Sequence, residues 1–417
     1  MTKHANLPFF SISDENIFLK LALMVMMISV VVSVMGNIPD MPLPSTPPST
    51  SDFSIDDTFC EGSIQSWSKT GINVYTLKVK RDPLGEKRWE WFYFRVSNLP
   101  IGEKLTFKLD YTEYEGRGWF SYWKPLASYT NVAVTSYDSW FRIHEASYSN
   151  YILKFSYTFT ESTVYICCSY PFPNDQYVNW LNTISSSEYA TVTHFGDGTQ
   201  GRAMYVLTIT NFTEPTANKK TIWNTAGQHT DETHNQIPLK EMCAWLLTDN
   251  ATARLLRNKF VWKNVIMADP DSNTNGRCRM NTKGYNLNRC WDGSPSATEI
   301  NNILDLIDDW NDTYGFDLFC DWHTDGRSYA YFYKLSSQGS EATNFCYNLT
   351  AHTSVTNGHI FDGGAGGFSF YEIGRLYPDA LAHLSENMQS DTSVTPAFLK
   401  AEGIGFALAV KDYFGVS

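Results

Sequence analysis

The first part of the chain alternates between apolar and polar residues in short runs. Five of these runs are rich in β-branched and aromatic residues, and turn-forming clusters such as RDPLG separate them. Alternation over about four to eight residues is typical of strands with one buried face. No helical stretch interrupts the series, so the sequence predicts an antiparallel β-sandwich domain over residues 53–180. The runs are INVYTLKVKR, RWEWFYFRV, KLTFKLDY, YILKFSYTF and STVYICCSY.

The pattern changes after Pro173. Short apolar runs (MYVLTIT, KNVIMAD and GFDLFCDWH) now alternate with longer segments of helical period. Strands that alternate with helices indicate an α/β layer structure, and we expect a catalytic domain with a mixed sheet over residues 181–417. The expected helices lie within HNQIPLKEMCAWLLT, SATEINNILDLIDDWNDTY and AEGIGFALAVKDYF.

The N-terminal residues have a different pattern. Residues 21–36 are apolar apart from two serines, and residues 37–52 contain five prolines without apolar periodicity. We interpret residues 1–36 as a signal peptide or signal anchor and residues 37–52 as an extended linker. The sequence thus predicts a secreted or luminal glycoprotein, with a membrane tether through residues 17–36 or a cytosolic protein as alternatives. Four glycosylation triplets follow the apolar segment, at Asn211, Asn250, Asn311 and Asn348.

Composition narrows the range of partners and sites. The 417 residues carry 32 basic and 44 acidic side chains, a net charge of −12, which makes a nucleic acid an improbable partner. Charged residues are 18% of the chain, too few for an intrinsically disordered protein. The eight cysteines include no CxxC pair, which argues against a zinc site made of cysteines.

Candidate chemistry lies in five short segments of the second half. In AGQHTDET, His229 and Glu232 are three residues apart, close enough for an imidazole nitrogen and a carboxylate oxygen to reach one ion. The segment FDLFCDWH ends a strand-like run on His323, at the strand end where α/β enzymes place their sites. The remaining segments contribute Arg277 and Arg279, then Asn288 and Arg289, and finally Glu372 in GFSFYEIG.

In this order the segments resemble the zinc metallocarboxypeptidases of the M14 family. That family has HPGE, NPDG followed by GNxR, DLNR, D-x-H and a late Glu, where this chain has HTDE, DPDS with NGRCR, NLNR, DWH and FYE. The segments FSIDDTFCEGSI, RWEWFYFRV and STVYICCSYPFP look like the β-domain that precedes the catalytic domain in the cytosolic carboxypeptidase subfamily. The resemblance covers about residues 53 to 417.

The resemblance implies a role for each site residue. His229, Glu232 and His323 would hold Zn²⁺ and leave a fourth position to water. Glu372 would be the general base, and Arg279 would stabilise the oxyanion. Asn288 and Arg289 would bind the C-terminal carboxylate of a peptide or protein, which makes the expected enzyme an exopeptidase.

Departures from the family pattern leave alternatives open. Thr230, Asp231, Asp269, Ser272 and Asn286 replace family residues that are neither metal ligands nor named catalytic groups. One alternative is a catalytically silent member that binds peptide or glycan through aromatic residues such as Trp91 and Tyr93, and another is a tubulin-type deglutamylase. In an oxidising compartment Cys278 and Cys290 could also form a disulfide beside the two arginines, although either could instead be a buried thiol or pair elsewhere.

Overall fold

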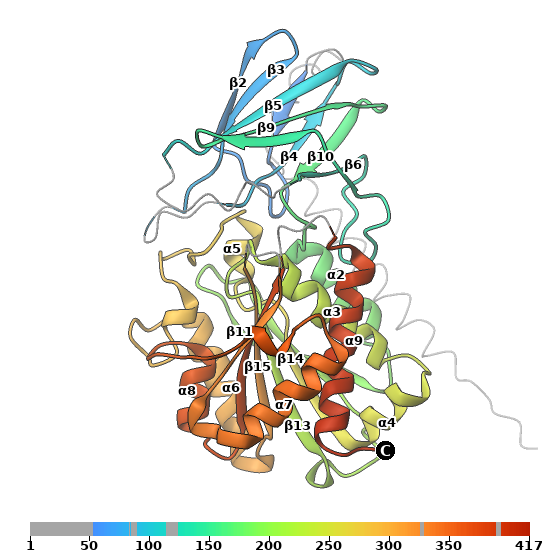
Figure 1. Cartoon of the computed structure of the whole chain (residues 1–417), viewed down its shortest axis with the longest axis vertical. Coiled ribbons are helices and arrows are strands. Elements are labelled where there is room, and N and C mark those ends of the chain that lie inside the picture. Colours follow the sequence, from blue (N-terminus) through green and yellow to red (C-terminus); the bar gives the residue numbers. More distant parts are fainter. Residues whose placement is uncertain (1–52, 83, 85–89, 114–123, 326–328, 389–392) are drawn as a thin grey trace, which may run out of the picture. The chain divides into compact units, whose positions relative to one another are not determined.

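The computed structural model describes residues 53–417 apart from residues 83, 85–89, 114–123, 326–328 and 389–392 (Figure 1). The predicted signal segment, membrane tether and proline-rich linker therefore lie outside the described residues. Within the described part of the chain, no helix is both long and apolar enough to cross a membrane. Residues 53–417 form one compact unit.

Residues 54–167 build two five-stranded sheets. Their strand orders are β1-β4-β10-β6-β7 and β2-β3-β5-β9-β8. Aromatic rings join the two sheets, since Phe94 of β4 lies 5.8 Å from Phe107 of β5 between ring centroids. The strands are β1 (Ser54–Asp56), β2 (Ser66–Gly71), β3 (Val74–Lys78), β4 (Tyr93–Ser97), β5 (Lys104–Asp110), β6 (Leu126–Ser128), β7 (Phe141–Arg142), β8 (Ala146–Ser149), β9 (Ile152–Thr158) and β10 (Thr163–Cys167).

The predicted sandwich is confirmed with one difference in strand direction. All five alternating runs contain a strand, and in β5 the alternate residues Leu105, Phe107 and Leu109 are fully buried. Strands β3 and β5, however, pair in parallel, so the second sheet is mixed. Trp91 and Tyr93 belong to the buried core. These two rings therefore support packing and cannot form an exposed platform for glycans.

The rest of the chain forms a mixed eight-stranded sheet, as the α/β pattern predicts. Its order is β11-β12-β14-β13-β15-β18-β16-β17, and β14, β13, β15 and β18 run parallel in the centre. The predicted domain boundary at residue 180 lies inside α2 and stays a prediction. The strands are β11 (Ala190–Asp197), β12 (Ala203–Ile209), β13 (Lys220–Ala226), β14 (Phe260–Val265), β15 (Leu318–Asp325), β16 (Tyr331–Lys334), β17 (Ile360–Asp362) and β18 (Leu381–Met388).

Helices cover both faces of the eight-stranded sheet. Helices α3, α7 and α9 contribute to one hydrophobic core, and α6 and α8 contribute to a second core (Figure 1). Alternate residues of β13 enter different cores, because Ile222 packs in the first and Trp223 in the second. The described helices are α2 (Asn174–Ile184), α3 (Thr233–Leu246), α4 (Ala251–Lys259), α5 (Pro270–Thr274), α6 (Thr298–Tyr314), α7 (Gly339–His352), α8 (Ser369–Leu376) and α9 (Pro396–Tyr413).

A buried joint connects the β-rich part to the α/β part. The Glu61 carboxylate accepts hydrogen bonds from the Phe172 backbone N–H and the Asn273 side chain, both at 3.0 Å. Burial raises the pKa of Glu61, although these donors oppose the change. Beside it, Gly276 has a φ of +60°, and a Cβ there would collide with the carbonyl oxygen of Gly62. The joint thus requires a glycine at position 276.

Candidate active site

Three neighbouring strands bring the candidate site together at their C-terminal ends. His229 and Glu232 lie in the turn between β13 and α3, and His323 lies near the end of β15. In the parallel pair of β15 and β18, His323 is directly opposite Glu386. Residues in register on adjacent strands point to the same face of a sheet, so Glu386 shares the face of His323.

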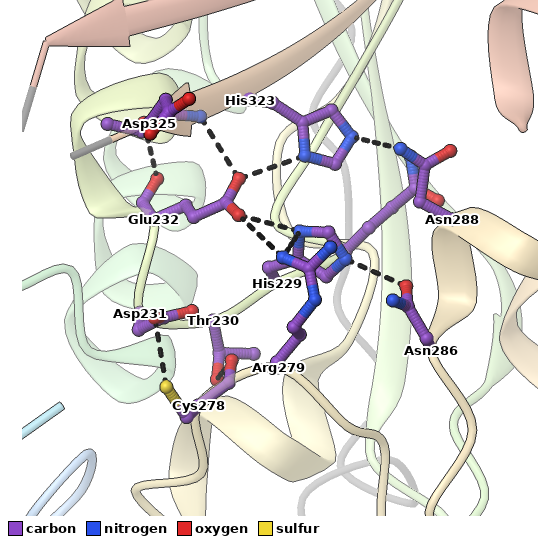
Figure 2. A network of polar contacts seen from close by, with 12 residues as sticks. His229, Thr230, Asp231, Glu232, Cys278, Arg279, Asn286, Asn288, His323 and Asp325 are labelled. Carbon is purple, nitrogen blue, oxygen red and sulfur yellow. Dashed lines mark hydrogen bonds and ion pairs between the residues drawn. The ribbon is translucent and has the colours of Figure 1, made fainter. Parts of the chain in front are cut away.

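His229, Glu232 and His323 form a compact set of donors. One ligand atom from each residue lies within 4.8 Å of the others, and all three residues are buried (Figure 2). Nδ1 of His229 is 2.7 Å from one carboxylate oxygen of Glu232, and Nδ1 of His323 is 2.9 Å from the other. Two imidazoles and a carboxylate are a ligand set that Zn²⁺ takes in catalytic sites. The residues present therefore fit this metal.

The remaining imidazole nitrogens are held by side chains behind the donor set. Nε2 of His229 donates to Oδ1 of Asn286 at 2.9 Å, and Nε2 of His323 donates to Asp321 at 2.8 Å. Such contacts fix the ring orientation and leave each Nδ1 facing the same point. Asn286 stands where the family motif has Asp, so the acceptor for Nε2 of His229 in this chain is a neutral amide oxygen.

The two imidazoles differ in their electrostatic surroundings. Burial and the nearby Arg279 lower the pKa of His229 to about 4. For His323 burial acts in the same direction, but the carboxylates of Asp321 and Glu232 outweigh it and raise the pKa. Burial also opposes the charge on Glu232, whereas both imidazoles lower the pKa of this carboxyl. Glu232 is therefore the anionic centre of the set.

Arg279 lies against the donor set. Its Nη1 is 3.3 Å from Nδ1 of His229 and 3.4 Å from a Glu232 oxygen (Figure 2). The Asp82 carboxylate, from the β-rich part, accepts three successive backbone N–H groups at Cys278, Arg279 and Met280 at 2.8 to 3.0 Å. The segment that carries Arg279 is thus fixed by a side chain from the other part of the chain.

Asn288 and Arg289 line the same pocket as the donor set. Both belong to the short 3₁₀ turn Leu287–Arg289, and Nδ2 of Asn288 is 3.1 Å from Nε2 of His323. The guanidinium of Arg289 lies over the Phe368 ring at 3.6 Å and donates to the carbonyl oxygen of Asn288. Phe368 therefore holds this guanidinium by a stacked cation contact.

A pocket of about 380 Å³ joins these groups. It contains all the predicted site residues except Glu372, and it also contains Glu386 and a group of aromatic and small residues that the sequence reasoning missed. Burial raises the pKa of Glu386, and the nearby Glu232 adds to the change. The lining residues are His229, Glu232, Arg279, Asn288, Arg289, His323, Tyr331, Tyr333, Gly364, Ala365, Phe368, Phe370, Leu384 and Glu386.

The structure does not bring Glu372 into the pocket. Glu372 lies in the first turn of α8, where its carboxylate accepts the Gly367 N–H at 3.1 Å and pairs with Arg375 at 2.7 Å. The prediction of Glu372 as the base therefore does not fit this geometry. The available signal for Glu386 was the alternating run LAHLSENM, which places Glu386 on the same strand face as Leu384.

The cysteines show no disulfide. All eight are free thiols, and Cys278 and Cys290 are both buried. Sγ of Cys278 is 2.9 Å from a carboxylate oxygen of Asp231, and Sγ of Cys290 is 3.2 Å from the backbone carbonyl of Asn286. The suggested Cys278–Cys290 bridge is therefore absent, since each sulfur contacts its own polar neighbour.

Two family models match the chain. The model described as cytosolic carboxypeptidase N-terminal domain matches residues 55–168, and the model described as zinc carboxypeptidase matches residues 177–399. The resemblance stated from the sequence motifs is thus confirmed for both parts of the chain.

Relatives and solved structures agree with these models. Cytosolic carboxypeptidase 2 of Xenopus tropicalis is 25% identical over 327 residues, covering 70% of this chain and 33% of the relative. Cytosolic carboxypeptidase 3 of Mus musculus is 27% identical over 296 residues, covering 64% of this chain and 29% of the relative. The chain thus spans about a third of the length of these relatives.

Solved structures share the fold. A metallo-carboxypeptidase from Burkholderia cenocepacia superposes with a TM-score of 0.75 at 21% identity, covering 87% of this chain and 98% of that chain. A metallo-carboxypeptidase from Pseudomonas aeruginosa gives a TM-score of 0.74 at 20% identity, covering 86% and 99%. The predicted fold, a mixed-sheet carboxypeptidase domain preceded by a β-domain, is confirmed.

The comparisons contradict the predicted location. The N-terminal family model and the relatives are those of cytosolic carboxypeptidases, so the prediction of a secreted or luminal protein is wrong. The predicted signal peptide and glycosylation have no support here either. An Asn-x-Thr triplet is a short pattern that chance also produces. Asn250, for example, accepts backbone hydrogen bonds from Thr252 and Ala253 as the N-cap of α4.

Proposed function

Because the chain belongs to the zinc carboxypeptidase family, we propose that it is a metallocarboxypeptidase acting on the C-termini of peptides or proteins. One observation carries the proposal: three metal-donor side chains and two arginines line one pocket. The proposed location is the cytosol, in agreement with the names of the relatives.

His229, Glu232 and His323 are proposed to hold the zinc ion. The two imidazoles offer Nδ1, because Asn286 and Asp321 occupy the other nitrogens. A bound zinc ion acts as a Lewis acid toward a carbonyl and lowers the pKa of water toward about 7. The other parts of the proposed reaction, which are proton transfer, stabilisation of the oxyanion and binding of the terminal carboxylate, are assigned to side chains of the protein.

Glu386, rather than Glu372, is proposed as the general base. It lines the pocket and lies in register with His323 on the neighbouring strand. A base must lie within hydrogen-bond reach of the proton that it accepts, and Glu372 is turned toward Arg375 instead. Glu386 would take a proton from the attacking water and pass it to the leaving amine.

The two arginines are proposed to serve different parts of the substrate. Arg279 lies beside the donor set, where it can donate to an oxygen that becomes negative as the peptide bond is attacked. Arg289 and Asn288 line the same pocket and would bind the terminal carboxylate, for which a planar guanidinium is well suited. Binding of that carboxylate would restrict the enzyme to the last residue of a chain.

Metal content and peptide trimming test this proposal together. The purified chain should bind about one zinc ion and shorten free-acid peptides from the C-terminus, while amidated peptides of the same sequence should stay intact. Zinc binding without trimming of any free-acid peptide would favour the alternative of a catalytically silent binding protein.

A further inference from the structure

The segment that carries Arg279 is buried or half-buried, yet it belongs to no helix or strand. Residues 277–280 follow α5, and no regular secondary structure supplies partners for their backbone N–H groups. A buried N–H group without a partner is costly, so another acceptor is required. Asp82 provides it. Its Oδ1 accepts the N–H of Cys278 at 3.0 Å, and its Oδ2 accepts those of Arg279 at 2.8 Å and Met280 at 2.9 Å.

A buried carboxylate is well suited to hold this segment. Asp82 is 8% exposed. Burial raises the pKa of its carboxyl, and the three backbone N–H groups oppose this change. Hydrogen bonds to a charged acceptor are roughly twice as strong as those between neutral groups. An asparagine amide in this place would offer one oxygen to three donors and would turn its own N–H groups toward some of them.

The same segment also contacts the turn that carries two of the proposed metal donors. The carbonyl oxygen of Cys278 accepts the backbone N–H of Thr230 at 2.9 Å, and the Thr230 hydroxyl donates to the carbonyl oxygen of Arg277 at 2.7 Å. Thr230 lies in the turn between β13 and α3, next to His229. Residues 277–280 are thus held by Asp82 through their N–H groups and by this turn through their carbonyl groups.

Arg279 extends from this doubly held backbone to the donor set. Its Nη1 is 3.3 Å from Nδ1 of His229 and 3.4 Å from a Glu232 oxygen (Figure 2). We propose that Asp82 is a positioning residue for Arg279, because it fixes the backbone from which the guanidinium reaches the donor set. The inference rests on the proposed function, in which Arg279 stabilises the oxyanion. Displacement of a group by about 1 Å can cost roughly 100-fold in rate.

Asp82 belongs to the β-rich part of the chain, shortly after the end of β3. It is not among the described residues that line the pocket. The β-rich part therefore contributes to catalysis by orienting a side chain of the α/β part, without touching the substrate. This gives the β-rich part a role in the reaction besides its contribution to folding.

Steady-state kinetics of Asp82→Ala test this role. The variant lacks the acceptor for three N–H groups but keeps Arg279, so kcat on a free-acid peptide should fall roughly 10- to 100-fold with little change in KM. The loss should be smaller than that of Arg279→Ala, for which we expect a roughly 100- to 1000-fold fall in kcat, the range for removal of an oxyanion donor. A raised KM with unchanged kcat in Asp82→Ala would contradict the proposal.

The double variant Asp82→Ala/Arg279→Ala shows whether Asp82 acts through Arg279. If it does, substitution of Asp82 should cause little further loss once Arg279 is absent, and the double variant should be about as slow as Arg279→Ala. Independent effects would multiply instead. A double variant slower than Arg279→Ala by the full factor measured for Asp82→Ala would contradict the proposal.

Asp56 offers a matched control within the β-rich part. Its carboxylate also accepts a backbone N–H, that of Thr58 at 3.2 Å, and it accepts Nε of Arg95 at 3.0 Å. Both partners lie in the β-rich part. Asp56→Ala should therefore lower the melting temperature and leave kcat close to wild type. A comparable fall in kcat in Asp56→Ala and Asp82→Ala would show that lost stability, and not the orientation of Arg279, slows the reaction.

Amide hydrogen exchange provides a readout that does not depend on activity. Exchange at residues 278–280 should accelerate in Asp82→Ala, and less so in Asp82→Asn, which keeps one acceptor oxygen, whereas Asp56→Ala should leave these amides unchanged. Unchanged exchange in both Asp82 variants would overturn the assignment.

The exchange measurement also separates this inference from the proposed function. If the wild-type protein cleaves no peptide, the proposed function fails, but accelerated exchange in the Asp82 variants would still support Asp82 as the group that holds the segment of Arg279. Should Asp82→Ala fail to fold, Asp82→Asn gives the same comparisons of kcat and of exchange, with smaller expected effects.

Discussion

Helix α8 and strand β18 are consecutive elements, and each contains a buried or partly buried glutamate in a different setting. The carboxylate of Glu372 on α8 accepts a backbone N–H and pairs with Arg375, and Glu372 is not among the residues that line the pocket. Glu386 on β18 lines the pocket opposite His323, where burial and the charge of Glu232 raise its pKa. The difference indicates that the carboxylate proposed as the base is better recognised by its neighbours in the sheet than by its place in the sequence.

Loss of a proposed metal ligand should have the largest effect on activity. The effects of substituting the two glutamates can be compared with it. In His323→Ala the donor set is incomplete, so we expect loss of bound zinc and of all measurable activity. Metal analysis of the purified variant, beside a peptide assay, checks this. Full zinc occupancy in His323→Ala would remove His323 from the ligand set and weaken the argument built on its register with Glu386.

Glu386→Gln should give the next largest effect. The variant keeps the donor set but lacks the base, so zinc content should be unchanged while kcat falls by roughly 10²- to 10⁴-fold. The matched control is Glu372→Gln. If Glu372→Gln shows the large loss and Glu386→Gln does not, the comparison is reversed and the sequence-based choice of Glu372 is restored.

Substitution of Arg289 tests the segment just before α8, because Phe368 in that segment stacks on the Arg289 guanidinium. We expect Arg289→Ala to cost about 2 to 5 kcal/mol in kcat/KM on free-acid peptides, the range for truncating one partner of a desolvated charge pair. On amidated peptides, which lack the carboxylate, wild type and variant should be equally poor. Equal losses on both kinds of peptide would mean that Arg289 has another role.

Removal of the Glu372 charge should affect stability and leave activity almost unchanged. In Glu372→Gln the contact with Arg375 loses its ionic character, so the melting temperature should fall, whereas kcat/KM should stay close to wild type. Thermal unfolding followed by circular dichroism measures the first effect. A wild-type melting temperature together with impaired turnover would argue for a direct catalytic role of Glu372.

Substitution of a third glutamate tests whether burial of a carboxyl group alone affects catalysis. This substitution should have the smallest effect on activity. Glu402 on α9 is 6% exposed, and burial raises its pKa to about 7. Between about pH 4.5 and 7 the folded protein therefore binds more protons at this site than the unfolded chain, so stability should fall as pH rises through that window. Glu402→Gln should remove this dependence without changing the pH profile of peptide hydrolysis. A changed activity profile would show that burial alone perturbs the site.

Much of the fold could be predicted from the local pattern of apolar and polar residues. Period-two alternation located β3, β4, β5, β9 and β10, and helical period located α3, α6 and α9. These patterns arise because one face of each element is buried. Strand order and direction did not follow, because pairing such as that of β3 with β5 depends on contacts between segments distant in the sequence.

The candidate site also has one part that the sequence predicts and one part that it does not. The metal donors were predictable because HxxE and D-x-H keep their members within a few residues of each other. Glu386 and Asp82 were not, since the role proposed for each depends on a neighbour that only folding provides: His323 across the sheet, and the backbone of residues 278–280. The prediction of a disulfide between Cys278 and Cys290 depended on an assumed oxidising compartment. In the structure each of these thiols instead contacts a polar neighbour of its own.

The contact of Gly276 with Gly62 bears on how this protein could have evolved. Since no side chain fits at position 276, the surfaces around residues 62 and 276 constrain each other, and neither can drift alone. A domain exchange that grafts the β-rich part of a distant relative onto this α/β part would have to reproduce that contact as well as the Glu61 joint. Recombination at the boundary of the two parts should therefore yield poorly folded hybrids far more often than recombination within a surface loop.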